Sequence, residues 1–159
     1  MSGARRRMGG CGILLVAMVL GLSAPAQTAK KNSAREKLIG AWHLVHIDAP
    51  GPDGKPAVPQ PKGMLIYTSD GHMSVQLMYP QSTNTLSNEY VLSGYEASFG
   101  GYDVDDATHT VTHHVQGSIT RDLLVGKDLP RKFEFTADGH LLIRSTRPDE
   151  HWSVMWAHY

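Results

Sequence analysis

Leu38-Ile39-Gly40-Ala41-Trp42 places a Gly-x-Trp tripeptide at the start of the first predicted strand, directly after a short helix-like segment at 33–37. A Trp at this position can lie across the closed end of a small β-barrel, and Gly40 lets the chain pass close beneath the ring. The tripeptide alone is common by chance. Its position makes it informative, because about eight strand-like segments include or follow it.

The rest of the chain alternates strand-like segments with turn residues. Most connections are short enough to join antiparallel neighbours, which favours an all-β, eight-stranded antiparallel up-and-down barrel over a sandwich. One or two short helices are expected beside it, at 33–37 and at 85–97. The predicted strands cover residues 38–48, 63–68, 72–79, 98–104, 109–117, 131–135, 141–145 and 151–158.

Two turns share one pattern, Thr-x-Asp-Gly-His, at 68–72 and at 136–140. A type I turn with a Gly bulge would place Thr opposite His in both hairpins. In the first hairpin this register pairs Leu65 and Tyr67 with the inward residues of the next strand, whereas a two-residue turn would pair Met64 and Ile66. The sequence leaves open whether Tyr67 faces the inside.

The N-terminal residues 1–26 have the pattern of a signal peptide. Three arginines (5–7) precede an apolar run at 13–22, and Ala24-Pro25-Ala26 supplies small residues for cleavage. We therefore expect an exported protein, periplasmic or secreted, with a flexible leader and short helix at 27–37 and a barrel domain at 38–159. A retained N-terminal anchor is the alternative. Cys11, the only cysteine, would leave with the signal, so no disulfide is expected.

Charge and hydropathy exclude several kinds of partner. Without the three N-terminal arginines, 12 basic residues remain against 15 acidic ones, a net charge of about −3. No large basic cluster remains, so nucleic acid is not an expected partner. No integral membrane span is expected after signal cleavage. The oligomeric state is not decided by the sequence.

Alternation along each strand predicts which side chains face the inside of the barrel. Trp42, Leu44 and His46 share a face, and Tyr102 should lie across from His113. The inward set is aromatic and aliphatic with few polar groups, as in a pocket for an apolar molecule or in a plain core. The predicted ligand-binding residues are Trp42, Leu44, His46, Val75, Leu77, Tyr102, Val104, Val111, His113, Val115, Phe133, Phe135 and Trp156.

The nine histidines raise the question of a metal or catalytic site. Only His46, His109 and His113 could converge inside the barrel, and no carboxylate shares their predicted face, so neither a metal nor a cofactor is expected. A haem ligand could come from His46, His113 or His158, although no other pattern asks for haem. For acid–base chemistry the candidates are His113 and Tyr102, with a purely structural hydrogen bond as the alternative. No catalytic residue is assigned.

These segments resemble the bacterial and fungal lipocalin-like domain family, distant relatives of the lipocalin (calycin) barrels. The resemblance covers about residues 38–156, nearly all of the mature chain. The segments that carry it are LIGAW (38–42), KGMLIYTSDGHMSVQ (62–76), SFGGYDV (98–104), TVTHHV (110–115) and RKFEF (131–135).

The resemblance implies a barrel that binds a small, usually apolar molecule. Some lipocalin-like relatives look like cyclases or isomerases that fold a reactive substrate in the barrel. Lipocalin barrels often pack a basic side chain over the Gly-x-Trp ring near the end of the last strand. Here Ala157 and His158 follow Trp156, so this basic residue is missing or comes from elsewhere, for which Arg144 is a candidate.

Together these observations favour an exported lipocalin-like protein that binds a small hydrophobic molecule inside a β-barrel. One alternative is a cyclase or isomerase of a secondary-metabolite-like substrate that uses the same cavity. The other is a filled barrel with a structural or interaction role. Enzymatic activity is uncertain and less expected than binding, and any activity would be non-hydrolytic because no nucleophile motif is present.

Overall fold

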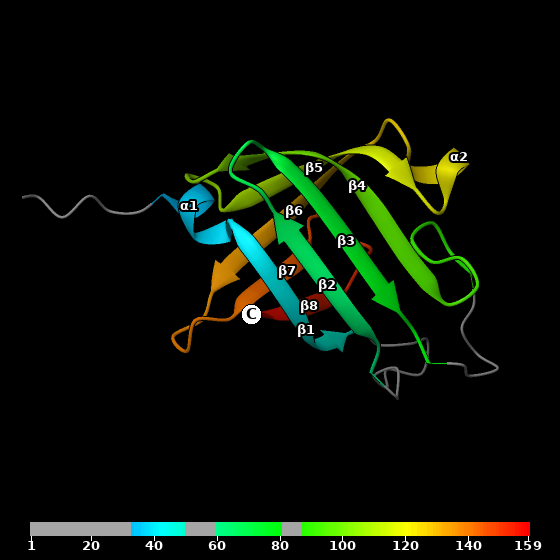
Figure 1. Ribbon diagram of the computed structural model, residues 1–159, viewed down its shortest axis with the longest axis horizontal. Coiled ribbons are helices and arrows are strands. Elements are labelled where there is room, and N and C mark those ends of the chain that lie inside the picture. Colours follow the sequence, from blue (N-terminus) through cyan, green and yellow to red (C-terminus); the bar gives the residue numbers. More distant parts are fainter. Residues whose placement is uncertain (1–32, 50–59, 81–86) are drawn as a thin grey trace, which may run out of the picture. The chain divides into compact units, whose positions relative to one another are not determined.

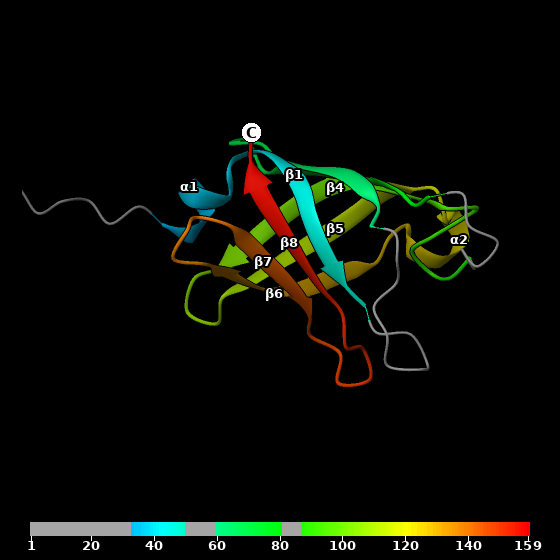
Figure 2. The same ribbon diagram turned by 90° about the horizontal axis from the view of Figure 1, so that it is seen from below.

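The computed structural model describes residues 33–49, 60–80 and 87–159. Eight strands pair in chain order and close into an antiparallel barrel, which confirms the predicted fold (Figure 1). Two short helices, α1 (Ala34–Leu38) and α2 (Arg121–Leu124), lie at opposite ends of the barrel (Figure 2). The strands are β1 (Gly40–Asp48), β2 (Lys62–Tyr67), β3 (His72–Met78), β4 (Tyr95–Asp105), β5 (Thr110–Ser118), β6 (Asp128–Phe135), β7 (Leu141–Ser145) and β8 (Ser153–His158).

Both Thr-x-Asp-Gly-His turns adopt the predicted Gly-bulge geometry. Gly71 and Gly139 have φ angles of 92° and 85°, a backbone region that glycine enters without steric cost. In the first hairpin the Thr68 amide donates to the His72 carbonyl at 2.9 Å. Tyr67 therefore pairs with Met73 and is buried inside the barrel, which resolves the direction that the sequence left open.

The helix predicted at 85–97 is wrong where the structure describes it; residues 81–86 lie outside the described ranges. Ser93 and Gly94 both have positive φ angles, 52° and 82°, and form a tight turn closed by two backbone hydrogen bonds between Leu92 and Tyr95. The chain then enters β4 at Tyr95, so residues 95–97 extend the sheet. The preference of Ser93 and Gly94 for a turn with positive φ angles is stronger than the weak helical periodicity of the segment.

A β-bulge in β1 corrects the predicted direction of His46. The pairing of β1 with β8 shifts between Leu44 and His46, so Val45 is an extra residue in β1. The alternation reverses after the bulge. His46 is exposed to solvent, and Ile47 takes the inward position.

Trp42 fills the end of the barrel beside α1, as the sequence predicts. Its side chain is 2% exposed, and its Nε1–H donates to the Leu38 carbonyl at 2.8 Å. The His158 ring lies edge-on to the Trp42 ring, with 4.5 Å between centroids. Arg144 does not take this place, because it is exposed and pairs with Glu134 at 3.4 Å.

The helix α1 is fixed against this end of the barrel. Ser33 and Glu36 form a reciprocal capping box that satisfies backbone donors at its start. The Arg35 guanidinium lies 4.9 Å from the centre of the Tyr102 ring, and the Ala34 amide donates to Asp106 at 3.2 Å. The end of the barrel around Trp42 is therefore closed by both packing and polar contacts.

The predicted signal peptide (1–26) and the first part of the predicted leader (27–32) lie outside the described residues. Within the described ranges, no helix is both long enough and apolar enough to cross a membrane.

Candidate ligand-binding site

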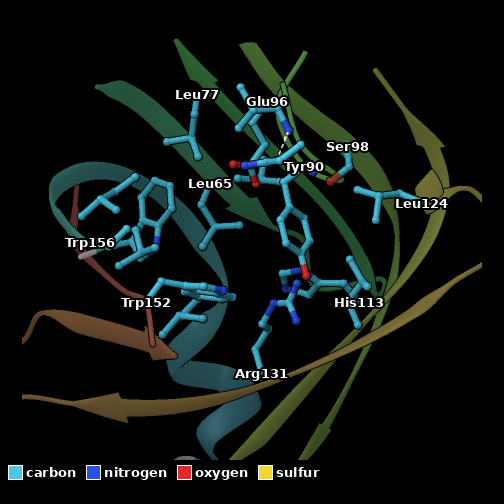
Figure 3. Close-up of a pocket in the computed structure, with 18 of the residues that line it drawn as sticks. Leu65, Leu77, Tyr90, Glu96, Ser98, His113, Leu124, Arg131, Trp152 and Trp156 are labelled. Atoms are coloured by element: carbon cyan, nitrogen blue, oxygen red, sulfur yellow. Dashed lines mark hydrogen bonds between the residues drawn. The ribbon is translucent and has the colours of Figure 1, made fainter. Parts of the chain in front are cut away.

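A cavity of about 180 Å³ lies inside the barrel, toward the end covered by α2 (Figure 3). Apolar side chains from five strands form one part of its wall. Polar side chains gather on another part, a grouping that the sequence did not predict. The apolar part contains Ile47, Leu65, Val75, Leu77, Ile143, Val154 and Trp156, and the polar part contains Asn88, Tyr90, Glu96, Ser98, His113 and Arg131.

Arg131 is the most unusual group in the wall, because a permanently charged side chain is only 6% exposed there. Its guanidinium carbon lies 5.4 Å from the centre of the Tyr90 ring and 4.9 Å from the centre of the Trp152 ring. Its Nη1 donates to the Pro130 carbonyl at 3.2 Å. Among the described residues, no salt bridge involves Arg131.

Glu96 brings a carboxyl group to the same cavity from β4, opposite Leu77 of β3. Burial raises the pKa of Glu96 from 4.5 to about 7, although the charge of Arg131 acts in the opposite direction. The nearby Tyr79 hydroxyl also has a raised pKa, through burial and the negative charge of Glu96. Glu96 therefore changes its charge near neutral pH.

His113 is buried on β5 and stays neutral. Burial, followed by the charges of Arg131 and His114, lowers the pKa of His113 from 6.5 to about 3. Its Nε2 lies 2.6 Å from the Tyr67 hydroxyl, whose own pKa is raised by burial. The hydrogen bond with Tyr67 thus orients the imidazole of His113, which also lines the cavity.

The predicted hydrogen-bonded pair of His113 and Tyr102 is wrong, although the two residues are cross-strand neighbours as expected. The Tyr102 hydroxyl donates instead to the Thr68 carbonyl at 2.9 Å. Tyr67 reaches His113 from β2, across the interior of the barrel. Strand alternation within one hairpin could not reveal that contact.

Residues 87–94, which precede β4, cover the cavity beside α2. Val91 is 5% exposed and lines the cavity. Glu89 forms an ion pair with Arg147 of the β7–β8 connection, in which Nη1 lies 2.7 Å from the carboxylate. Its backbone carbonyl also accepts a hydrogen bond from the Thr120 hydroxyl at 2.7 Å. Residues 87–94 are therefore attached both to the β7–β8 connection, through Arg147, and to the start of α2, through Thr120.

The predicted ligand-binding residues divide into three groups by their positions. Val75, Leu77, His113 and Trp156 line the cavity. Val115 is buried without lining it, and His46 is exposed. The remaining residues belong to the hydrophobic core or pack against it: Trp42, Leu44, Tyr102, Val104, Val111, Phe133 and Phe135.

Of the six polar residues of the wall only His113 was predicted, and the two missed residues of most consequence are Glu96 and Arg131. Arg131 could have been found, since it alternates with Phe133 and Phe135 and so shares their inward face. Glu96 was missed because the helix expected at 85–97 gave this residue no place on a strand. A carboxylate therefore does face the interior, contrary to the prediction.

The histidines expected to converge lie apart. His46 and His109 are exposed, and the His109 ring packs edge-on to Phe133 at 5.8 Å, whereas His113 is buried. Within the described part of the chain, no group of three His, Cys, Asp or Glu residues is placed to hold a metal ion.

The fold and the cavity together define a small closed barrel that is filled at one end and hollow at the other. The sequence profile of a family described as "Lipocalin-like domain" matches residues 39–157. The chain therefore belongs to the lipocalin-like domain family. A search of curated proteins found no match to the chain.

Proposed function

We propose that this protein is exported and binds a small, largely apolar molecule in the cavity of its barrel. The observation that carries the proposal is a cavity of about 180 Å³ with a mainly apolar wall. An engineered apolar cavity of about 150 Å³ in another protein is known to take up benzene, so the space suits a body of about one ring. The signal-like pattern of residues 1–26 supports export.

The wall contains a few hydrogen-bonding groups, which is the usual composition of a ligand site. These groups come from Tyr90, Glu96, Ser98, His113 and Arg131. They can orient the polar end of a ligand whose body lies against the apolar part of the wall.

The binding proposal can be tested by filling the cavity. Val75→Phe adds a ring to the wall, so binding of toluene, followed by NMR titration, should be lost while the protein stays folded. Val45→Phe is the matched control, because Val45 is 42% exposed on the bulge of β1 and should leave toluene binding unchanged. Unchanged binding in Val75→Phe would place the ligand elsewhere and contradict the proposal.

Native mass spectrometry of the protein from its own source would reveal any molecule that copurifies. Export is tested separately, by cell fractionation and by N-terminal sequencing of the mature protein. The expected first residue is Gln27. A cytoplasmic protein that still carries residues 1–26 would contradict export. That result would not bear on the binding proposal.

A second candidate function is a cyclase or isomerase, which one observation favours. The pKa of Glu96 is about 7, close to the value that suits a general acid or base at neutral pH. His113 is less suited to this role, because its pKa is about 3. Glu96→Gln should then abolish turnover of a bound substrate, and a variant with undiminished turnover would exclude this role for Glu96.

A further inference from the structure

Arg131 is a buried cation for which the chain supplies no carboxylate partner among the described residues. A guanidinium has five N–H donors and does not deprotonate in proteins. Arg131 donates a hydrogen bond to the Pro130 carbonyl, and its charge and its side-chain hydrogen bond with the Tyr90 hydroxyl lower the pKa of Tyr90 against the effect of burial. Stacking between Tyr90 and Trp152 further stabilises the charge.

The carboxyl groups near Arg131 form no salt bridge with it among the described residues. Glu150 accepts hydrogen bonds from Ser145 and the Trp152 Nε1, and shares Arg147 with Glu89. The charge of Arg131 also contributes to the lowered pKa of Glu150, so Glu150 offsets part of the Arg131 charge from a distance. Glu96 is largely protonated below pH 7, since burial outweighs the effect of Arg131 on its pKa. Among the described residues that line the cavity, Arg131 therefore carries the net charge under mildly acidic conditions.

We propose that the cavity selects small apolar carboxylic acids and binds their carboxylate group at Arg131. This inference rests on the proposed ligand-binding function and names the chemical class of the ligand. A carboxylate matches the planar fork of a guanidinium with two parallel hydrogen bonds. A phosphate dianion fits less well, because Arg131 is the only cationic residue among the described residues that line the cavity, and Glu96 lies in the same wall.

The rest of the wall fits the apolar body of such an acid. Leu65, Val75, Ile143 and Trp156 line the cavity. Trp156 lies on the side of the cavity away from His113 (Figure 3). The volume of about 180 Å³ limits the ligand to about one ring with a short acidic group. The protonated Glu96 and the neutral Ser98 hydroxyl can donate further hydrogen bonds to a carboxylate.

Benzoate and benzamide separate charge from size and shape, since the two molecules are nearly isosteric. NMR titrations of the protein at pH 6 should show benzoate binding at least about tenfold tighter than benzamide. Arg131→Met should remove this preference, and Arg131→Lys should restore part of it, because it keeps the charge and loses the fork. Arg144→Met is the matched control on the surface of β7 and should leave the preference unchanged.

A pH titration of the wild-type protein tests the same inference without a variant at Arg131. Of the described titratable residues in the wall, Tyr79, Tyr90, His113 and Arg131 keep their charge states between pH 5.5 and 8.5, and Glu96 ionises. Because ionised Glu96 competes for Arg131 and repels an anion, benzoate affinity should fall at least about threefold across this range. Glu96→Gln should flatten the profile.

The outcomes distinguish this inference from the function on which it rests. Binding of toluene and benzamide with no preference for benzoate would overturn the carboxylate inference and leave ligand binding intact. Failure of toluene, benzamide and benzoate to bind would overturn both. A benzoate preference that persists in folded Arg131→Met, or benzoate affinity that does not fall with pH, would also contradict the role of Arg131.

Discussion

At the end of the barrel beside α1, Trp42, Tyr67 and Phe133 are 1–4% exposed and pack against one another and their neighbours. The end beside α2 instead contains a cavity of about 180 Å³, and Arg131 is buried in its wall with no salt-bridge partner among the described residues. Close packing stabilises a fold, whereas cavities and unpaired buried charges reduce its stability. The comparison indicates that the filled end supplies stability and that the hollow end reduces it.

The largest effect is expected from removing the tryptophan of the filled end. Trp42→Ala should lower the free energy of unfolding by about 3–5 kcal/mol, because a fully packed ring leaves a cavity behind. Trp152→Ala is the matched change at the hollow end and should cost clearly less, since Trp152 is only half-buried beside existing space. Urea denaturation of both variants measures the difference, and equal costs would remove the contrast between the ends.

The two titratable groups of the cavity should affect the pH dependence of stability in opposite directions. The raised pKa of Glu96 means that the unfolded state loses its proton first, so its contribution to stability falls as pH rises from about 4.5 to 7. The lowered pKa of His113 means that the unfolded state gains a proton first, so its contribution falls as pH drops from 6.5 towards 3. Between pH 4.5 and 6.5 the two contributions offset each other.

Glu96→Gln should remove the contribution of Glu96 and leave that of His113. The free energy of unfolding of the variant, relative to wild type, should increase by about 2–3 kcal/mol as pH rises from 4.5 to 7. His113→Phe should change the relative stability with the opposite sign between pH 4.5 and 6.5. Chemical denaturation at several pH values tests both, and a relative stability that does not change with pH would show that neither group is perturbed by the hollow end.

A smaller effect is expected from a matched pair of leucines. Leu141 is fully buried outside the cavity, and Leu77 is 5% exposed on the cavity wall. Leu141→Ala should cost at least about 1 kcal/mol more than Leu77→Ala, because a side chain beside an empty space already lacks contacts on one side. Thermal and urea unfolding measure the difference, and a larger cost for Leu77 would contradict the assignment of the two ends.

The strands and their registers could be predicted because local chemistry encodes them. Gly71 and Gly139 set the hairpin registers through turns that need positive φ angles. The facing of Tyr67 stayed open in the sequence, because a two-residue turn would have reversed it, and the structure decides it. The predicted pairing of Tyr102 with His113 across β4 and β5 is confirmed.

The polar part of the site was harder to predict, for two physical reasons. A bulge inserts one residue without a composition signal, so His46 was assigned to the wrong face beyond Val45. The contact between Tyr67 and His113 joins β2 to β5 across the interior, and no local pattern links strands that do not pair. Arg131 was within reach of alternation, but charged residues are rarely buried and it was overlooked.

The pairing of β1 with β8 brings the two ends of the domain together. The Tyr159 amide donates to the Ala41 carbonyl at 3.0 Å, and Trp42 lies opposite His158 in the ladder. A short linker between the C-terminus and α1 would therefore join the ends without breaking the sheet. New termini cut at the exposed turn around Gly139 would give a circular permutant that retains every strand pair, which makes the barrel a scaffold whose start point can be chosen freely.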